Sequence, residues 1–268
     1  MEKYFHVFSL GIQNTLVYRV NFLFRAAFGL VPLAGTLFLW RAIYAGKEPG
    51  AVLGGYTLAQ MISYYLLVTV VDAVTAVAED DWQIAADIKD GQVSQFLLKP
   101  MDYLGYRLCL YGSGRAIYTT MALIPVAIFI LFQRQHFVLP TDSATLGVAV
   151  LSVVLAGILQ FFIAYTVALL AFWVLDVSTF IFIQFAFEYI ASGHLFPLDI
   201  LPAALHRLIL LTPYPYLLYF PVGVYLGQIR GAALLQGLAM QVFWVLAAFG
   251  IARWMWSRGL RKYTAVGG

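Results

Sequence analysis

Four aspartates gather in one short polar stretch of an otherwise apolar chain: Asp80, Asp81, Asp87 and Asp90. Carboxylates at this density could hold Mg²⁺ and, through it, a diphosphate. A magnesium-diphosphate site of that kind needs a second acidic cluster opposite the first, and the remaining acids are scattered singly along the chain. The stretch is therefore interpreted as a docking element for a partner protein, with a solvated loop as the plainer alternative.

Two carboxylates, Asp72 and Glu188, stand inside apolar runs long enough to cross a membrane. An ionisable group in hydrocarbon is costly unless it faces water or a partner. Glu188 follows Phe185 closely in an aromatic stretch, so an amphipathic or cationic ligand could find ring faces and a carboxylate together. A structural hydrogen bond would explain Glu188 equally well. Asp72 is expected to line an inner vestibule or to pair with a basic residue, and all three residues are pathway candidates.

Other catalytic signatures are absent from the sequence. No Gly-x-x-x-x-Gly-Lys-Ser/Thr motif occurs, so the chain is not expected to bind ATP itself. The single cysteine, Cys109, excludes an intramolecular disulfide framework, and the four histidines are too dispersed to predict a metal site. We expect no bound cofactor, no metal and no enzymatic activity in this chain.

Composition indicates that water is not the main solvent of this protein. Hydrophobic residues make up 62% and charged residues 11%, with a mean hydropathy of +0.85, whereas soluble domains carry about 25% charged residues. The 16 basic and 13 acidic side chains could not cover so much apolar surface in water. We predict an all-α integral membrane protein, which contacts lipid and no nucleic acid.

Apolar runs of about twenty residues, the length that crosses the hydrocarbon core, predict six transmembrane helices in one domain covering residues 1–268. Only a short polar break at Asp176 separates the fourth run from the fifth, which predicts a tight antiparallel hairpin. Residues 1–25 place apolar side chains at helical spacing and predict a helix in the membrane interface; a polar lead-in to the first span is the alternative. The six runs are 26–44, 56–78, 116–132, 144–175, 177–196 and 232–256.

The basic residues predict the orientation. With the N-terminus inside and six spans, 11 of the 16 Lys and Arg residues fall on the inner side and 5 on the outer side. Cytoplasmic segments carry the excess of basic residues in membrane proteins. Both termini and the loop 79–115 are therefore predicted to be cytoplasmic.

The loop 79–115 is predicted to contain a short amphipathic helix. Trp82, Ile84 and Ile88 give the helix an apolar side. Gly91 can end it in a left-handed conformation, and Pro100 stops a second helical stretch from continuing. A cytosolic protein could seat this element in a groove.

The segment between the fifth and sixth runs, residues 193–230, is too rich in proline for an ordinary span. Irregular backbone survives at membrane depth only where protein or a wet cavity surrounds it. We therefore predict a re-entrant hairpin at an outer gate, with an aromatic interfacial anchor as the alternative. The predicted gate residues are Gly193, Pro197, Pro202, Pro213 and Pro221.

Two stretches carry a resemblance to a known family. The sequence Ile88-Lys89-Asp90-Gly91 followed by Leu97-Leu98-Lys99-Pro100 resembles the loop between spans two and three of ABC-2-type transporter permeases. The later stretch, Ser192 to Pro202 followed by Leu211 to Pro215 and Phe220-Pro221, is similar to the region between their spans five and six. The resemblance covers nearly the whole chain and rests on the order of its parts.

The resemblance implies a permease subunit of an ATP-driven ABC exporter in the bacterial cytoplasmic membrane, forming half of a translocation pathway. It further implies a second permease subunit, identical or related, and two separate ATPase subunits that bind ATP and Mg²⁺. A secondary transporter or channel, or a membrane scaffold without transport, are the alternatives. The residues implied to couple to the ATPase are Trp82, Ile84, Asp87, Ile88, Lys89, Asp90, Gly91, Leu97, Leu98, Lys99 and Pro100.

Overall fold

The computed structural model describes residues 2–48, 50–77, 80–140 and 142–263. Almost all of this part of the chain is helical, and its only β feature is an isolated bridge between Leu53 and Tyr56. Ala78, the predicted end of the second span, and Glu79, the predicted start of the coupling loop, lie outside the described residues. The prediction of an all-helical membrane protein is confirmed.

Five helical runs in the described part of the chain are long and apolar enough to cross a membrane. One of them, Leu58–Lys89, includes both α3 (Leu58–Thr75) and α4 (Asp80–Lys89), and another, Ser143–Phe172, includes α7 (Ser143–Ala168) and a terminal 3₁₀ turn. The other three are α2 (Arg19–Ala45), α6 (Tyr103–Phe132) and α11 (Gly231–Lys262).

The predicted fifth span, residues 177–196, differs from these five runs. It corresponds to α8 (Ser178–Ala191), an apolar helix of 14 residues. A helix of that length covers about 21 Å, less than the roughly 30 Å of hydrocarbon. The helix stops because Gly193 takes a positive φ of 85°. Six full-length spans are therefore not observed among the described residues.

Short helices make up the remainder of the fold. Helix α1 lies at the start of the chain and α5 lies in the predicted coupling loop. The others divide the segment after α8 into pieces. They are α1 (Glu2–Leu16), α5 (Gln92–Leu97), a 3₁₀ turn at Leu198–Ile200, α9 (Ala203–Leu210), a 3₁₀ turn at Tyr214–Tyr216 and α10 (Tyr219–Tyr225).

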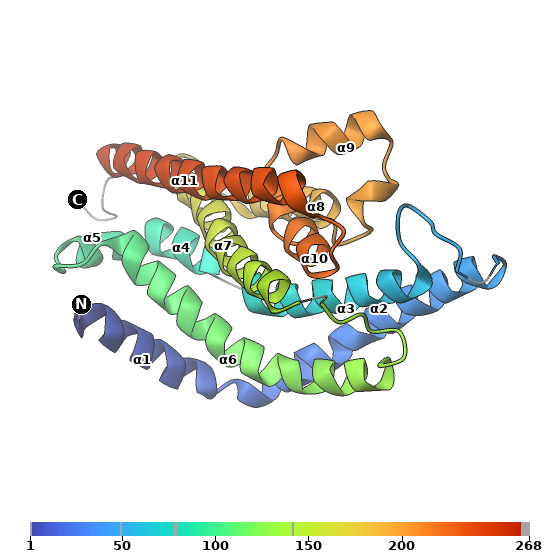
Figure 1. Cartoon of the computed structure of the whole chain (residues 1–268). Helices are drawn as coiled ribbons and strands as arrows, with labels where there is room; N and C mark the ends of the chain where they lie inside the picture. Colours follow the sequence, from blue (N-terminus) through green and yellow to red (C-terminus); the bar gives the residue numbers. More distant parts are fainter. Residues whose placement is uncertain (1, 49, 78–79, 141, 264–268) are drawn as a thin grey trace.

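Helix α3 forms the centre of the bundle, in contact with α2, α6, α7 and α10. It begins at a capping box, in which the side chains of Thr57 and Gln60 each bind the backbone of the other residue. The start of α1, the end of α11 and α5 lie at one end of the molecule, whereas the connection between α2 and α3 lies at the other end (Figure 1). The bundle thus has a terminal end, which carries α5, and an opposite end.

Helix α1 lies along the first half of α6 (Figure 1). The predicted single helix over residues 1–25 is divided by a turn at Val17 and Tyr18, after which α2 begins. The two helices approach closely at Gly11, where a Cβ atom would lie 2.1 Å from the Ser113 hydroxyl. Small residues allow such an approach between membrane helices.

We predict that Gly11→Leu separates α1 from α6 and lowers the thermal unfolding temperature of the purified protein by several degrees. The added side chain would overlap Ser113, which is fully buried. The matched control is Gly29→Leu, because no atom lies within 4 Å of a Cβ built at Gly29. Equal unfolding temperatures for the two variants would contradict the close packing of α1.

Candidate functional site

Helices α4 and α5 form a compact element that packs onto the bundle by one face. Ile84, Ile88, Val93 and Phe96 are all buried. Gly91 joins the two helices with φ 75° and ψ 6°, so the predicted left-handed stop at this residue is confirmed. Helix α5 ends at Leu97, three residues before Pro100.

A buried ion pair fixes α4 to α6. The Arg107 guanidinium pairs with the Asp87 carboxylate and donates further hydrogen bonds to the side-chain and backbone oxygens of Gln83, each at 3.2 Å. The hydroxyl of Tyr103 donates to Asp87 at 2.6 Å and accepts from Arg107 at 3.0 Å. All three guanidinium nitrogens have acceptors, and the Asp87 carboxylate accepts from both Arg107 and Tyr103. Such pairing is what allows a largely buried ion pair to be tolerated. Three of the predicted coupling residues, Ile84, Asp87 and Ile88, therefore contact the chain's own bundle.

The other face of this element is open. Leu98 is 87% exposed and Leu97 is half exposed, whereas Trp82, also about half exposed, borders a cavity. Charged and polar residues complete the surface, since Lys89, Asp90, Lys99 and Pro100 are exposed as well. We call the residues 89–100 that are exposed the outward tip; Gly91 forms its turn.

The three pathway candidates meet in one cavity of about 540 Å³. Asp72 enters it from α3, Phe185 and Glu188 enter from α8, and Trp82 contributes from α4. The Glu188 carboxylate accepts hydrogen bonds from the side-chain amides of Gln160 (2.7 Å) and Gln184. We call this space the carboxylate cavity.

Several residues that line the carboxylate cavity were not among the pathway candidates predicted from the sequence. A lone glutamine inside an apolar run, as at 160 and 184, is a signal of an internal hydrogen bond and could have identified two of them. The remaining polar lining could not have been assigned without the fold. The polar residues missed are Arg25, Asp81, Arg115, Gln160, Gln184, Ser192 and His194.

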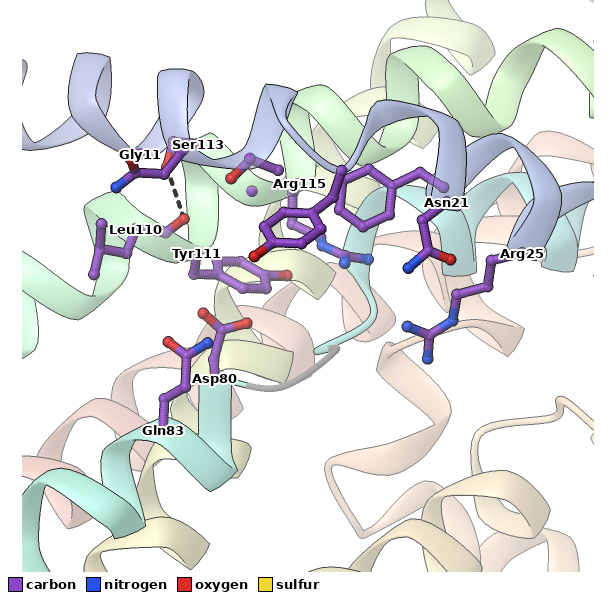
Figure 2. A pocket seen from close by; sticks show the side chains of 14 residues that line it. Gly11, Asn21, Arg25, Asp80, Gln83, Leu110, Tyr111, Ser113 and Arg115 are labelled. Carbon is purple, nitrogen blue, oxygen red and sulfur yellow. Dashed lines mark hydrogen bonds between the residues drawn. The ribbon is translucent and has the colours of Figure 1, made fainter.

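A second cavity, of about 510 Å³, adjoins the first. Figure 2 shows Arg25 and Arg115 extending into it from α2 and α6, opposite Asp80 and Gln83 of α4. Both arginines line the carboxylate cavity too. The arginines therefore mark the place where the two spaces join, and α4 contributes to the wall of each.

A separate polar network holds the segment after α8. The Asp199 carboxylate accepts hydrogen bonds from the hydroxyls of Tyr56 (2.8 Å) and Tyr219 (2.7 Å). The hydroxyl of Tyr64 donates to the backbone carbonyl of Gly193 at 2.7 Å. Burial, together with the neighbouring Asp199 charge, raises the pKa of Tyr56 far above its usual range, so these tyrosines stay protonated donors.

The predicted gate residues occupy the breaks in this segment. Gly193 follows the end of α8, and Pro197 and Pro202 precede a 3₁₀ turn and α9. Pro213 precedes the 3₁₀ turn at Tyr214–Tyr216, and Pro221 lies buried inside α10. Among the described residues, no three His, Cys, Asp or Glu side chains group as a metal ion would require.

Comparison with known protein families shows the family of the chain. The family model described as ABC-2 family transporter protein matches residues 30–267. The chain belongs to the ABC-2 transporter family. The resemblance seen in the sequence is thus confirmed, and the ABC-2 match supports a permease of an ABC transporter. No curated protein matches the chain, and no solved structure matches it.

In this ABC-2 protein, we predict that Arg107→Gln lowers the free energy of unfolding by about 3 to 5 kcal/mol, because it leaves the Asp87 charge buried without its partner. The control is Arg253→Gln, which removes an ion pair with Asp102 whose two side chains are 44% and 39% exposed. An exposed pair contributes about 1 kcal/mol or less. Denaturant unfolding of both purified variants measures the difference, and similar losses would contradict the assigned role of the buried pair.

Proposed function

We propose that the chain is the permease half of an ATP-driven exporter, to which a separate ATPase binds at the outward tip. The observation that carries the proposal is the double role of α4. Its outer end leads into the exposed tip, while Asp80, Asp81, Trp82 and Gln83 at its start line the two cavities. A partner that moves the tip therefore moves the walls of both cavities.

The ion pair between Asp87 and Arg107 would make α4 and α6 move together. Because Asp87 is held by Arg107 and Tyr103, α4 cannot shift without α6. Only a short connection separates α4 from α3. Closure of two ATP-loaded ATPase subunits would then pull on two spans as a rigid unit, which is a common route for switching between conformations.

A second permease subunit, identical or related, would complete the pathway. Helix α8 has one buried residue, Ile181, and exposes large aromatic side chains such as Phe182 (71%) and Phe187. The helix borders the carboxylate cavity, so a partner subunit against α8 would close that side of the cavity. In this arrangement α8 acts as a short span, the fifth of six along the chain.

The segment 193–230 is proposed as a re-entrant outer gate. Support comes from α10, six of whose seven residues are buried in the bundle, and from its place away from α5 (Figure 1). The hydrogen bonds to Asp199 would hold the gate closed until the bundle rearranges.

We predict that Leu98→Glu weakens binding of the ATPase at least tenfold, since it places a charge on the most exposed apolar residue of the outward tip. The control is Leu139→Glu, which changes a residue that is 72% exposed in the connection between α6 and α7. Co-purification of the ATPase with the tagged chain, followed by titration, measures the effect. Equal binding by both variants would contradict docking at the tip, and the absence of any co-purifying ATPase would favour a secondary transporter or a scaffold.

The proposed orientation predicts which single cysteines react from outside sealed cells. In a Cys109→Ser background, cysteines at Lys47 and Gln228 should react with an impermeant maleimide, whereas cysteines at Lys89 and Arg261 should react only after permeabilisation. The physical reason is the excess of basic residues on the cytoplasmic side. External labelling at Lys89 would overturn the orientation.

A further inference from the structure

The second cavity lies where α1 and α2 meet beside α6. Asn14 and Tyr18 line it from this junction, and Asn21 and Arg25 line it from the first two turns of α2. Arg115 of α6 completes the polar set, and Figure 2 shows its guanidinium in the same space as Asn21 and Arg25. The first four residues are exposed and Arg115 is partly exposed, so a ligand can reach their polar groups.

Neither arginine of this cavity has a partner of opposite charge among the described residues. The ion pairs in this part of the chain use Arg107 and Arg253, and neither Arg25 nor Arg115 donates a hydrogen bond to a described side chain. The Arg115 guanidinium does lie over the Tyr118 ring, 4.6 Å from its centre. A ring covers only a face of a guanidinium, and the N–H donors lie in its plane. Both arginines therefore keep donors that an anion can use.

Carboxylates line the two adjoining cavities, but none of those described comes from α1 or α2. Asp80 lines the second cavity, and Asp72, Asp81 and Glu188 line the carboxylate cavity. All four belong to α3, α4 or α8. The described lining residues of α1 and α2 are neutral apart from Arg25. An anion on this side of the second cavity therefore meets amides, hydroxyls and a guanidinium, and no carboxylate of these two helices.

The lengths of α2 and α6 place both arginines near the level of the lipid headgroups. Toward the opposite end of the bundle, Arg41 of α2 donates to Gln133 at the end of α6, at 2.6 Å. Arg25 precedes Arg41 by 16 residues, and Arg115 precedes Gln133 by 18 residues, which corresponds to about 24 to 27 Å of helix. The hydrocarbon core is roughly 30 Å thick, so a long arginine side chain extends to the headgroups at the terminal end.

Phosphate is the anionic group that a membrane presents at this level. A guanidinium matches phosphate oxygens with parallel N–H donors, and an asparagine amide adds further donors. Apolar side chains at the same junction, Val17, Val20 and Phe24, are each more than half exposed. Polar donors inside the cavity and apolar side chains beside it fit the two parts of a phospholipid.

We propose that the second cavity binds the phosphate group of a phospholipid from the leaflet at the terminal end. Arg25 and Arg115 donate to the phosphate oxygens, Asn21 contributes an amide donor, and the acyl chains lie against the exposed apolar side chains of the junction. A soluble phosphate ester shares the recognised group, whereas a lipid without phosphate lacks it. The lipid is a bound component of the protein, and its binding does not depend on export.

The test uses the purified full-length chain, freed of lipid in a neutral detergent and without ATPase. Native mass spectrometry measures the affinity for three probes: dioleoylphosphatidylglycerol, dioleoylglycerol and glycerol 3-phosphate. We expect the phospholipid to bind at least tenfold more tightly than either of the others. Equal binding of the two lipids would overturn recognition of phosphate. Equal binding of the phospholipid and glycerol 3-phosphate would overturn the lipid as the source of that phosphate.

Variants separate this cavity from the general attraction of basic residues to lipid. Arg25→Gln should weaken phospholipid binding about tenfold, because it removes charge-assisted hydrogen bonds. The matched control is Arg19→Gln, which changes another exposed arginine of α2 that does not line the cavity and should leave the affinity unchanged. Equal losses in these two variants would overturn the site.

A third variant keeps the proposal testable if Arg25→Gln folds poorly in a thermal melt. Asn21→Asp has nearly the same shape and places a negative charge in the cavity, so it should weaken phospholipid binding at least as much. Asn21 is exposed, and the change removes no packed side chain. Unchanged affinity in Asn21→Asp would overturn the proposal.

Discussion

The buried ion pair between Arg107 and Asp87 is the constraint on which the arrangement of the terminal end depends. Taking two charges out of water costs several kcal/mol unless every donor and acceptor is satisfied, and here Gln83 and Tyr103 complete the set. Tyr103 also stacks on Trp256 of α11, with ring centres 4.7 Å apart and planes at 7°, and packs edge-on against Phe96 of α5. One polar cluster therefore ties α4, α5, α6 and α11 together.

That cluster gives α4 its position between the outward tip and the interior of the bundle. The face bearing Ile84 and Ile88 is buried, so the outward tip stands on a fixed base. The start of the same helix forms part of both cavity walls. Under the proposed function, a rigid helix with these two contacts would carry a displacement of the tip to the cavity walls, because a packed interior has low compressibility.

Polar side chains at two places in the bundle bind the irregular backbone. Tyrosines from α3 and its preceding turn bind Asp199 and the backbone at Gly193, and Gln241 of α11 binds the backbone carbonyls of Ser152 and Tyr216. In a membrane, broken backbone must find its hydrogen bonds within the protein. These amides and hydroxyls supply them, which explains how a proline-rich segment packs beside continuous helices.

The sequence by itself determined the membrane class, the long apolar helices, the left-handed turn at Gly91 and the family, because length, hydropathy and local backbone preference are properties of neighbouring residues. It could not determine that α8 stops short, or that Asp87 and Ile88 face inward while Leu98 faces outward, because a helix with apolar side chains on one face can bury that face against its own chain or against a partner. The cavity that unites Asp72, Phe185 and Glu188 with Gln160 and Ser192 was decided only by tertiary structure. These five residues come from α3, α7, α8 and the turn after α8. Their proximity is set by helix packing, which local sequence does not encode.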